Sequence, residues 1–220
     1  DICKTMPIGQ TKTLQDTRGS YNTTTPANYG IIKAKDNNCW MTDNLNLYNR
    51  QISSSDSDLP SGTSLTLPNT SNWSTIDAVF RAHRGTTFTN QVYYNWCSAI
   101  ASTALCSQLG DTNFTAPNSI CPKNWKLPSS NNYENLKTIY GFSTEQQLVS
   151  SELSYGYWGI WNYYTQSEYG ASNMARIWTS SYGHVSLQRP YSFDYGSNLI
   201  VSYGIDSDVA IGQPIRCMAR

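Results

Sequence analysis

The sequence predicts an α+β fold in which helices and antiparallel strands occupy separate parts of the chain. Two helix patterns stand between residues 129 and 153, and the chain reads as strands from Tyr155 onward. Six cysteines, an even number, are spread over the whole length. Segregated helices and strands are typical of α+β domains, and 220 residues are the size of one domain.

The first helix is expected from Asn131 to Tyr140. Asn131 and the two serines before it can each cap the N-terminus, and Glu134 stands at capping-box distance from Asn131. Gly141 supplies the C-terminal stop. Between these two signals, one apolar face is formed by Tyr133, Leu136, Ile139 and Tyr140. The start, the face and the end therefore all predict the same helix.

Two shorter helices and a core segment are also expected. One helix begins at Ser143, where Gln146 completes another capping-box pattern, and ends near Leu153. Another runs from about Thr75 to Arg84, because its apolar side chains share one face at helical spacing. Residues 91–106 are rich in apolar side chains and are expected in the core.

The last part of the chain predicts strands and a hairpin. Residues 176–179 form one short strand, and residues 191–195 and 199–205 alternate apolar with polar side chains around a turn at 196–198. This alternation leaves Ser192, Asp194, Ser202, Gly204 and Asp206 facing away from the apolar side, where we expect them on the surface. Residues 214–219 predict a final strand. Residues 50–75, in contrast, lack any sustained period and predict a long loop excursion.

Charge and composition exclude two classes of partner. Lys and Arg number 15, Asp and Glu also number 15, and the formal net charge is zero. The chain therefore lacks the positive charge used to bind nucleic acid or anionic membranes. No apolar run approaches the roughly 18 residues of a membrane-spanning helix. We expect no nucleic-acid partner and no direct membrane insertion.

The six cysteines predict disulfides. They lack the paired CxxC spacing of zinc sites, and their spacing alone leaves every pairing of the six open. Disulfides imply an oxidising compartment. We therefore expect the mature part of an exported precursor, whose export signal or anchor has been removed.

No catalytic or metal-binding motif is found in the sequence. Its two histidines, His83 and His184, lie about a hundred residues apart and outside HExxH, HxH or Cys/His patterns. There is no Gly-x-Ser-x-Gly elbow and no glycine-rich phosphate loop. We expect neither an enzyme nor a bound cofactor.

Five blocks of sequence carry a family resemblance. They are Cys39 to Leu45, Tyr93 to Trp96, Cys121 to Pro128, Ile177 to Ser181 and Gly212 to Cys217. In this order they resemble the signatures of a bacterial family, the Fibrobacter succinogenes major paralogous domain, including its cysteine-proline segment before the first long helix and its closing arginine-cysteine strand. The resemblance covers residues 29–220 and implies a fold similar to that of C-type lectins, preceded by a β-rich extension at residues 1–28.

The resemblance also implies a set of disulfides. A bridge between the residue before the long helix and the last strand would hold the two ends of the domain together, as in C-type lectins. A second bridge would close a small loop, which leaves the remaining two cysteines as a third pair. The implied pairs are Cys121 with Cys217, Cys97 with Cys106, and Cys3 with Cys39.

Calcium-dependent sugar binding is not supported by the sequence. Sugar-binding C-type lectins hold calcium through a Glu-Pro-Asn or Gln-Pro-Asp triplet and a Trp-Asn-Asp strand. This chain has Gln213-Pro-Ile215 and Trp178-Thr-Ser180 in those places. Two aspartate pairs, at positions 56 and 58 and at 206 and 208, could form only a weak site, and solvated loops are the simpler interpretation.

The resemblance places the ligand face in the loops and hairpin before the last strand, about Ser180 to Ile211. This stretch combines tyrosines with Ser, Gly, Asn and Asp, a composition that resembles antibody paratopes. We expect it to bind a protein or glycan on another cell or a virus. The candidate ligand-binding residues are Tyr182, His184, Ser186, Tyr191, Asp194, Tyr195, Asn198, Ser202, Tyr203, Asp206 and Asp208.

The same stretch also lacks four residue types. No Lys, Glu, Trp or Met occurs from Thr179 to Ile211, although these types make up a tenth of the chain. Together with Gln, they are the types that an AAC codon cannot reach when its adenines are randomised. Diversity-generating retroelements randomise codons in this way in proteins of the C-type lectin fold, so we expect a variable protein. A hairpin that is half core and half surface would show a similar composition.

The sequence therefore predicts an extracellular or cell-surface binding protein of the adhesin or receptor type. One alternative is a structural subunit of a pilus or envelope. Another is an oxidoreductase of the formylglycine-generating type, whose fold is related and which would need a free pair of cysteines.

Overall fold

The computed structural model describes residues 2–19, 25–67, 80–85, 91–106, 113–170, 173–183, 190–196, 199–201 and 209–220. Within these ranges the fold is mixed, with mostly antiparallel sheets, four helices and three disulfides. The content of helices and antiparallel strands therefore confirms the expected α+β class. In the same ranges, no helix combines the length and the apolar character that crossing a membrane requires.

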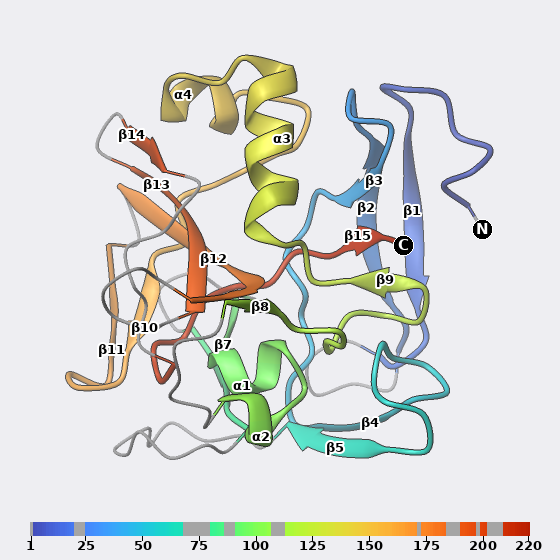
Figure 1. Cartoon of the computed structure of the whole chain (residues 1–220), viewed down its shortest axis with the longest axis vertical. Helices are drawn as coiled ribbons and strands as arrows, with labels where there is room; N and C mark the ends of the chain where they lie inside the picture. Colours follow the sequence, from blue (N-terminus) through green and yellow to red (C-terminus); the bar gives the residue numbers. More distant parts are fainter. Residues whose placement is uncertain are drawn as a thin grey trace.

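A five-stranded sheet occupies one side of the molecule (Figure 1). In spatial order its strands are β1 (Thr11–Asp16), β2 (Ala27–Lys33), β3 (Cys39–Met41), β15 (Met218–Ala219) and β9 (Trp125–Lys126). β15 is the last strand in sequence, yet it lies inside the sheet, where Met218 pairs with both Trp40 and Lys126. The predicted final strand is therefore present, but only two of its residues join the ladder.

The N-terminal segment is an integral part of this sheet. All six residues of β1 pair with β2, and Ile31 and Ile32 of β2 are fully buried. The expected boundary between an extension and the main domain, at residues 28 and 29, falls inside β2. Strand β1 therefore forms one edge of the sheet.

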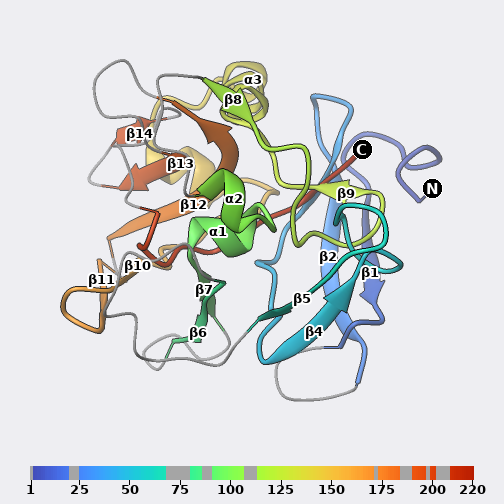
Figure 2. The same cartoon turned by 60° about the horizontal axis from the view of Figure 1, so that its bottom comes forward.

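A four-stranded sheet lies on the opposite side of the molecule (Figures 1 and 2). In spatial order its strands are β14 (Leu199–Val201), β13 (Pro190–Gly196), β12 (Met174–Tyr182) and β8 (Phe114–Thr115). The predicted C-terminal hairpin is confirmed, with Gly196 opposite Leu199. Both faces of β12 and β13 are covered, because Phe193 packs in one hydrophobic cluster and Trp178 in the other.

Three two-stranded ribbons complete the strands. They are β4 (Arg50–Ser53) with β5 (Ser64–Leu67), β6 (Ala82–Arg84) with β7 (Val92–Tyr94), and β10 (Ile160–Asn162) with β11 (Ser167–Tyr169). The predicted loop excursion at residues 50–75 therefore contains a hairpin. Burial alternates along its two strands, and Ile52 and Leu67 face the core. The expected helix at residues 75–84 is wrong at its end, where β6 pairs with β7; residues 75–79 lie outside the described residues.

The helices are α1 (Trp96–Ala99), α2 (Thr103–Cys106), α3 (Ser130–Tyr140) and α4 (Glu145–Val149). The predicted long helix is confirmed as α3. Ser129 caps it, and the capping-box partner is Asn132 rather than the expected Glu134. Gly141 ends it in the left-handed conformation, at φ 65°, where a side chain would be strained.

Helix α4 is shorter than the expected span of residues 143–153. Gln147, rather than Gln146, accepts hydrogen bonds from the amides before the helix. At the other end, the hydroxyls of Ser150 and Ser151 donate to the carbonyls of Gln146 and Leu148. Serine hydroxyls that compete for helical carbonyls favour helix termination.

The three disulfides match the pairing that the family resemblance implies. All six cysteines are bonded, and the Cα atoms of the three pairs lie 5.7, 5.1 and 5.9 Å apart. The pairs are Cys3 with Cys39, Cys97 with Cys106, and Cys121 with Cys217.

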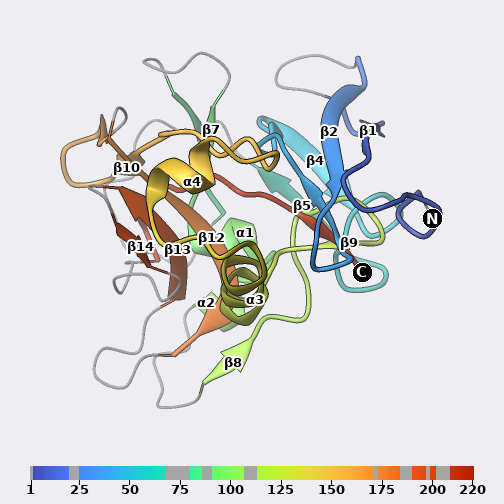
Figure 3. The same cartoon turned by 90° about the horizontal axis from the view of Figure 1, so that it is seen from above.

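Residues 212–217 connect the two sheets. This segment crosses the molecule from the four-stranded to the five-stranded sheet (Figures 1 and 3). Along its path the carbonyls of Pro214, Ile215 and Cys217 accept hydrogen bonds from the amides of Trp178, Leu45 and Met41. Residues 212–217 are therefore hydrogen-bonded to β12 of one sheet and to β3 of the other.

Candidate ligand-binding surface

Four of the eleven candidate ligand-binding residues lie within the described residues. They are Tyr182, Tyr191, Asp194 and Tyr195. Seven lie outside them: His184, Ser186, Asn198, Ser202, Tyr203, Asp206 and Asp208. The geometry of the candidate surface therefore rests on the first four and on their neighbours.

Tyr195 lies in the core. It is 2% exposed, its hydroxyl donates to the carbonyl of Gly156, and its ring meets those of Tyr155 and Trp158 edge-on. Burial raises the pKa of its phenol well above the ordinary value. Its ring therefore supports the sheet from inside rather than from the surface.

Asp194 is also buried, although alternation along β13 predicted that it faces solvent. One of its oxygens accepts a hydrogen bond of 2.7 Å from the Ser192 hydroxyl, and the other lies 3.0 Å from Nε of Arg176. The N–H of Nε does not point at that oxygen, so this contact is an ion pair rather than a hydrogen bond. Loss of solvent therefore dominates and raises the carboxyl pKa to about 6, against the lowering effects of Arg176 and Ser192.

Tyr182 and Tyr191 line an open groove of about 320 Å³ at one end of the four-stranded sheet. Tyr191 is half-buried, whereas Tyr182 is 2% exposed and presents only the edge of a core side chain to the groove. Tyr182 is the last residue of β12, and Tyr191 is near the start of β13. The other described lining residues are Asn113, Phe114, Thr115, Ser130, Asn131 and Ser181. Two of the predicted residues are thus brought together with the end of β8 and the N-terminus of α3.

A stack of aromatic rings holds the Tyr182 side of the groove in place. The ring of Phe114 lies parallel to that of Tyr182, with centroids 5.0 Å apart, and Trp96 packs against Tyr182 at 5.4 Å. The indole nitrogen of Trp96 donates to the carbonyl of Thr179 at 2.9 Å. Strand pairing places Phe114 directly opposite Tyr182. The aromatic wall is therefore fixed by the core beneath it.

Helix α3 forms the opposite wall through a serine pair. The hydroxyl of Ser181 accepts a hydrogen bond from the Ser130 amide at 3.0 Å, and the two hydroxyls lie 3.1 Å apart. These bonds join the first turn of α3 to β12. Asn131, the next residue, then lies at the groove.

The described lining of the groove is uncharged. None of its eight described lining residues carries a carboxylate, imidazole or ammonium group, and burial raises the pKa of the Tyr182 phenol. At neutral pH the groove therefore offers aromatic faces, hydroxyls and amides. Such groups bind through contact area and neutral hydrogen bonds.

Sequence reasoning missed the residues that β8 and α3 contribute. Phe114 and Thr115 are about 70 residues before Tyr182 in the chain, and no local pattern marks them. The one available signal was the start of the long helix, because the side chains after its cap must face a neighbouring element.

The first aspartate pair serves the structure. Asp56 accepts hydrogen bonds from the Ser53 amide and the Ser57 hydroxyl, and Asp58 is paired with Arg220. Within the described residues, no group of three or more His, Cys, Asp or Glu could hold a metal ion. The second pair, at positions 206 and 208, lies outside these residues.

Comparison of the chain with family models, with curated proteins and with solved structures gives no match.

Proposed function

We propose that the chain is the ligand-binding domain of an exported protein, and that it binds a protein or glycan in the groove beside Tyr182 and Tyr191. The three disulfides support an oxidising, extracellular location. The observation that carries the proposal is the chemistry of the groove. Its rings provide contact area with few rotatable bonds, and its hydroxyls and amides provide adaptable hydrogen bonds.

Binding fits the groove better than catalysis does. Ser130 and Ser181 bond to each other, and the described lining holds no base that could activate a hydroxyl. A ligand with both an apolar face and polar edges, such as a sugar ring or a peptide, would match this lining. The groove thus supports recognition of neutral polar groups.

We also propose that the fold is C-type-lectin-like and that the chain is related to the Fibrobacter succinogenes major paralogous domain. Three of the five sequence blocks that resemble this family meet at the fifth, because Met41, Tyr94 and Trp178 hydrogen-bond to residues 213–217. The Cys121–Cys217 disulfide joins the remaining block to the same segment. Blocks that are far apart in sequence but meet in space support a shared architecture.

Diversification of the ligand face is part of the proposal. Ser181, Tyr182 and Tyr191 belong to the stretch that lacks Lys, Glu, Trp and Met. The other groove residues precede that stretch and would form a constant wall. A retroelement that randomised adenines in this stretch would therefore change one wall of the groove and leave the other unchanged.

The binding proposal is tested by screening the protein against a glycan array and a library of cell-surface proteins, with two matched variants. Tyr191→Ala removes a half-buried groove ring, and Tyr164→Ala removes a ring that is 75% exposed on the turn between β10 and β11. For any ligand found, we expect at least a tenfold weaker affinity for Tyr191→Ala and no change for Tyr164→Ala. Equal affinities for Tyr191→Ala and the unchanged protein would place the ligand elsewhere.

Diversification is tested by sequencing the coding region across a natural population of the source. We expect substitutions to concentrate between Ser180 and Ile211, at codons with adenine-derived changes. Substitutions that spread evenly over the chain would exclude a retroelement but leave the binding proposal intact.

A further inference from the structure

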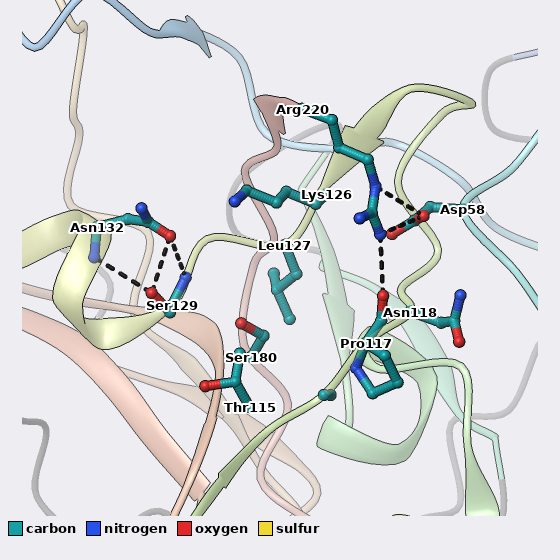
Figure 4. A pocket seen from close by; sticks show the side chains of 11 residues that line it. Asp58, Thr115, Pro117, Asn118, Lys126, Leu127, Ser129, Asn132, Ser180 and Arg220 are labelled. Carbon is teal, nitrogen blue, oxygen red and sulfur yellow. Dashed lines mark hydrogen bonds and ion pairs between the residues drawn. The ribbon is translucent and has the colours of Figure 1, made fainter.

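A second, polar pocket of about 230 Å³ lies between the C-terminal strand region and the start of α3 (Figure 4). Figure 4 shows the pair of Asp58 and Arg220 on one side and Ser129 with Asn132 on the other, with Lys126 and Leu127 between them. The pocket shares Thr115 with the groove. Its lining is otherwise different, because it contains charged side chains.

The only carboxylate among the described lining residues is already occupied. Oδ1 of Asp58 accepts hydrogen bonds from Nε and Nη2 of Arg220, at 3.1 and 2.6 Å. Its Oδ2 accepts one of 3.0 Å from the Ser119 hydroxyl. Asp58 and Arg220 therefore neutralise each other, and the positive charge of Lys126 is left over in the lining.

Several donors of the pocket have no partner among the described residues. The ammonium of Lys126 and the side-chain NH₂ of Asn132 make no hydrogen bond there, since the capping box uses only the carbonyl oxygen of Asn132. The hydroxyl of Ser180 makes none either, although this residue is 2% exposed. The Ser180 oxygen is not sealed from solvent, so it faces the pocket and is open to a ligand that bonds to it.

We propose that this pocket binds the carboxylate of one acidic sugar unit of a glycan. Lys126 pairs with the carboxylate, and the hydroxyl of Ser180 and the amide of Asn132 bond to the sugar hydroxyls. One surplus positive charge matches one negative charge, which favours a carboxylate over a phosphate dianion. The volume is below the roughly 300 to 1,000 Å³ of pockets that enclose a whole ligand, so a single unit enters and the rest of the glycan stays outside.

A sugar fits this lining better than an acidic peptide side chain does. The methylene groups of an aspartate or glutamate offer no partner to Ser180 or Asn132, which would remain unpaired. A sugar unit brings hydroxyls for both and an apolar ring face for Leu127, whose side chain lines the pocket. The site is distinct from the groove, and its ligand does not depend on what the groove binds.

The test is an NMR titration of the labelled protein with methyl β-D-glucuronide and with methyl β-D-glucoside, which differ only in the carboxylate. We expect the glucuronide to shift the amide signals of Thr115, Lys126 and Ser180, with an affinity at least tenfold higher than that of the glucoside. Lys126→Met should reduce the affinity for the glucuronide to that for the glucoside, and Lys126→Arg should retain it. Lys137→Met is the matched control, because Lys137 lies in the last turn of α3 and should not matter.

Equal affinities for the two glycosides, or an affinity for the glucuronide that is unchanged in Lys126→Met, would overturn the proposal. An N-acetyl-glutamate amide that binds as tightly as the glucuronide would overturn the assignment to sugar. Because Lys126→Arg keeps the charge, its folded spectrum and retained binding separate loss of the site from loss of the fold. None of these outcomes bears on the Tyr191→Ala test of the groove.

Discussion

The guanidinium carbon of Arg216 lies 4.4 Å from the ring centroid of Tyr155 and 4.4 Å from that of Trp158. The arginine is 1% exposed, and its two terminal nitrogens donate to the carbonyls of Leu153 and Ser154 at 2.6 and 2.7 Å. Ring faces and carbonyl oxygens therefore balance this buried charge. Burial lowers the pKa of the guanidinium from its ordinary value.

Arg216→Lys should destabilise the protein even though it retains the charge. A lysine ammonium cannot present a flat face to the rings and reach both carbonyls at once. Hydrogen bonds from a charged group are worth about 1.5 to 3 kcal/mol each and a buried cation–π contact about 2 kcal/mol. We expect the free energy of unfolding in urea to fall by about 2 to 4 kcal/mol. Arg220→Lys, whose side chain is 45% exposed, should change it by less than about 1 kcal/mol.

The carboxyl of Asp194 should make stability depend on pH. Its pKa is raised to about 6 in the folded protein, against about 3.9 in an unfolded chain. Between these pH values the folded state holds the proton and the unfolded state does not. The contribution of Asp194 is therefore fully present below about pH 4 and is lost as the pH rises through 6.

The measurement for Asp194 is urea unfolding of the wild-type protein and of Asp194→Asn from pH 4 to pH 7.5. We expect the difference in unfolding free energy, wild type minus variant, to fall as the pH rises to about 6.5 and then to level off. A difference that increases with pH would mean that the ion pair with Arg176 outweighs the loss of solvent.

The three disulfides should not contribute equally to the stability of the folded protein. Cys121 and Cys217 are separated by 96 residues, whereas Cys97 and Cys106 are separated by 9. Because the entropy of the unfolded chain falls more when a longer loop is closed, the longer loop is worth about 2 kcal/mol more. We expect the Cys121→Ala/Cys217→Ala pair to lower the melting temperature well below that of the Cys97→Ala/Cys106→Ala pair. Similar melting temperatures would show that strain in the folded state, or residual structure in the unfolded state, offsets the difference in loop entropy.

Tyr195 should behave as a core residue. Tyr195→Ala removes a ring that is 2% exposed and should cost about 3 to 5 kcal/mol. Tyr195→Phe removes only the hydroxyl that donates to the Gly156 carbonyl and should cost about 1 kcal/mol. Thermal and urea unfolding measure both, with the exposed Tyr164→Ala as the control at less than about 1 kcal/mol. A Tyr195→Ala protein as stable as wild type would show that the Tyr195 ring is not part of the core.

Sequence patterns predicted the elements whose signals are local. Helix α3 was found because its cap, apolar face and Gly141 stop are all encoded within about a dozen residues. The β13–β14 hairpin was found because alternation flanks a Gly-Ser-Asn turn. The same alternation misplaced Asp194, because it assumes one solvated face, and both faces of β13 are covered.

The candidate site was predicted only in part. Tyr191 is half-buried and lines the groove, but alternation could not separate it from Tyr195, which points into the core. The distinction depends on α3 packing over β13, where Tyr133 stacks on Phe193 with centroids 4.6 Å apart. Such a contact joins residues that are 60 positions apart, and no periodicity within either segment contains it.

The place of β15 between β3 and β9 constrains the order in which the protein can be assembled. The pairing of Met218 with Trp40 joins residues from opposite ends of the described chain, so the five-stranded sheet closes only after almost everything between them has been synthesised. Contacts this distant in sequence slow folding, and until they form, β3 and β9 present unpaired edges that can pair with other chains. A protein exported before it folds would avoid this hazard in the cell, and oxidation of Cys121 with Cys217 would then lock the last strand in place.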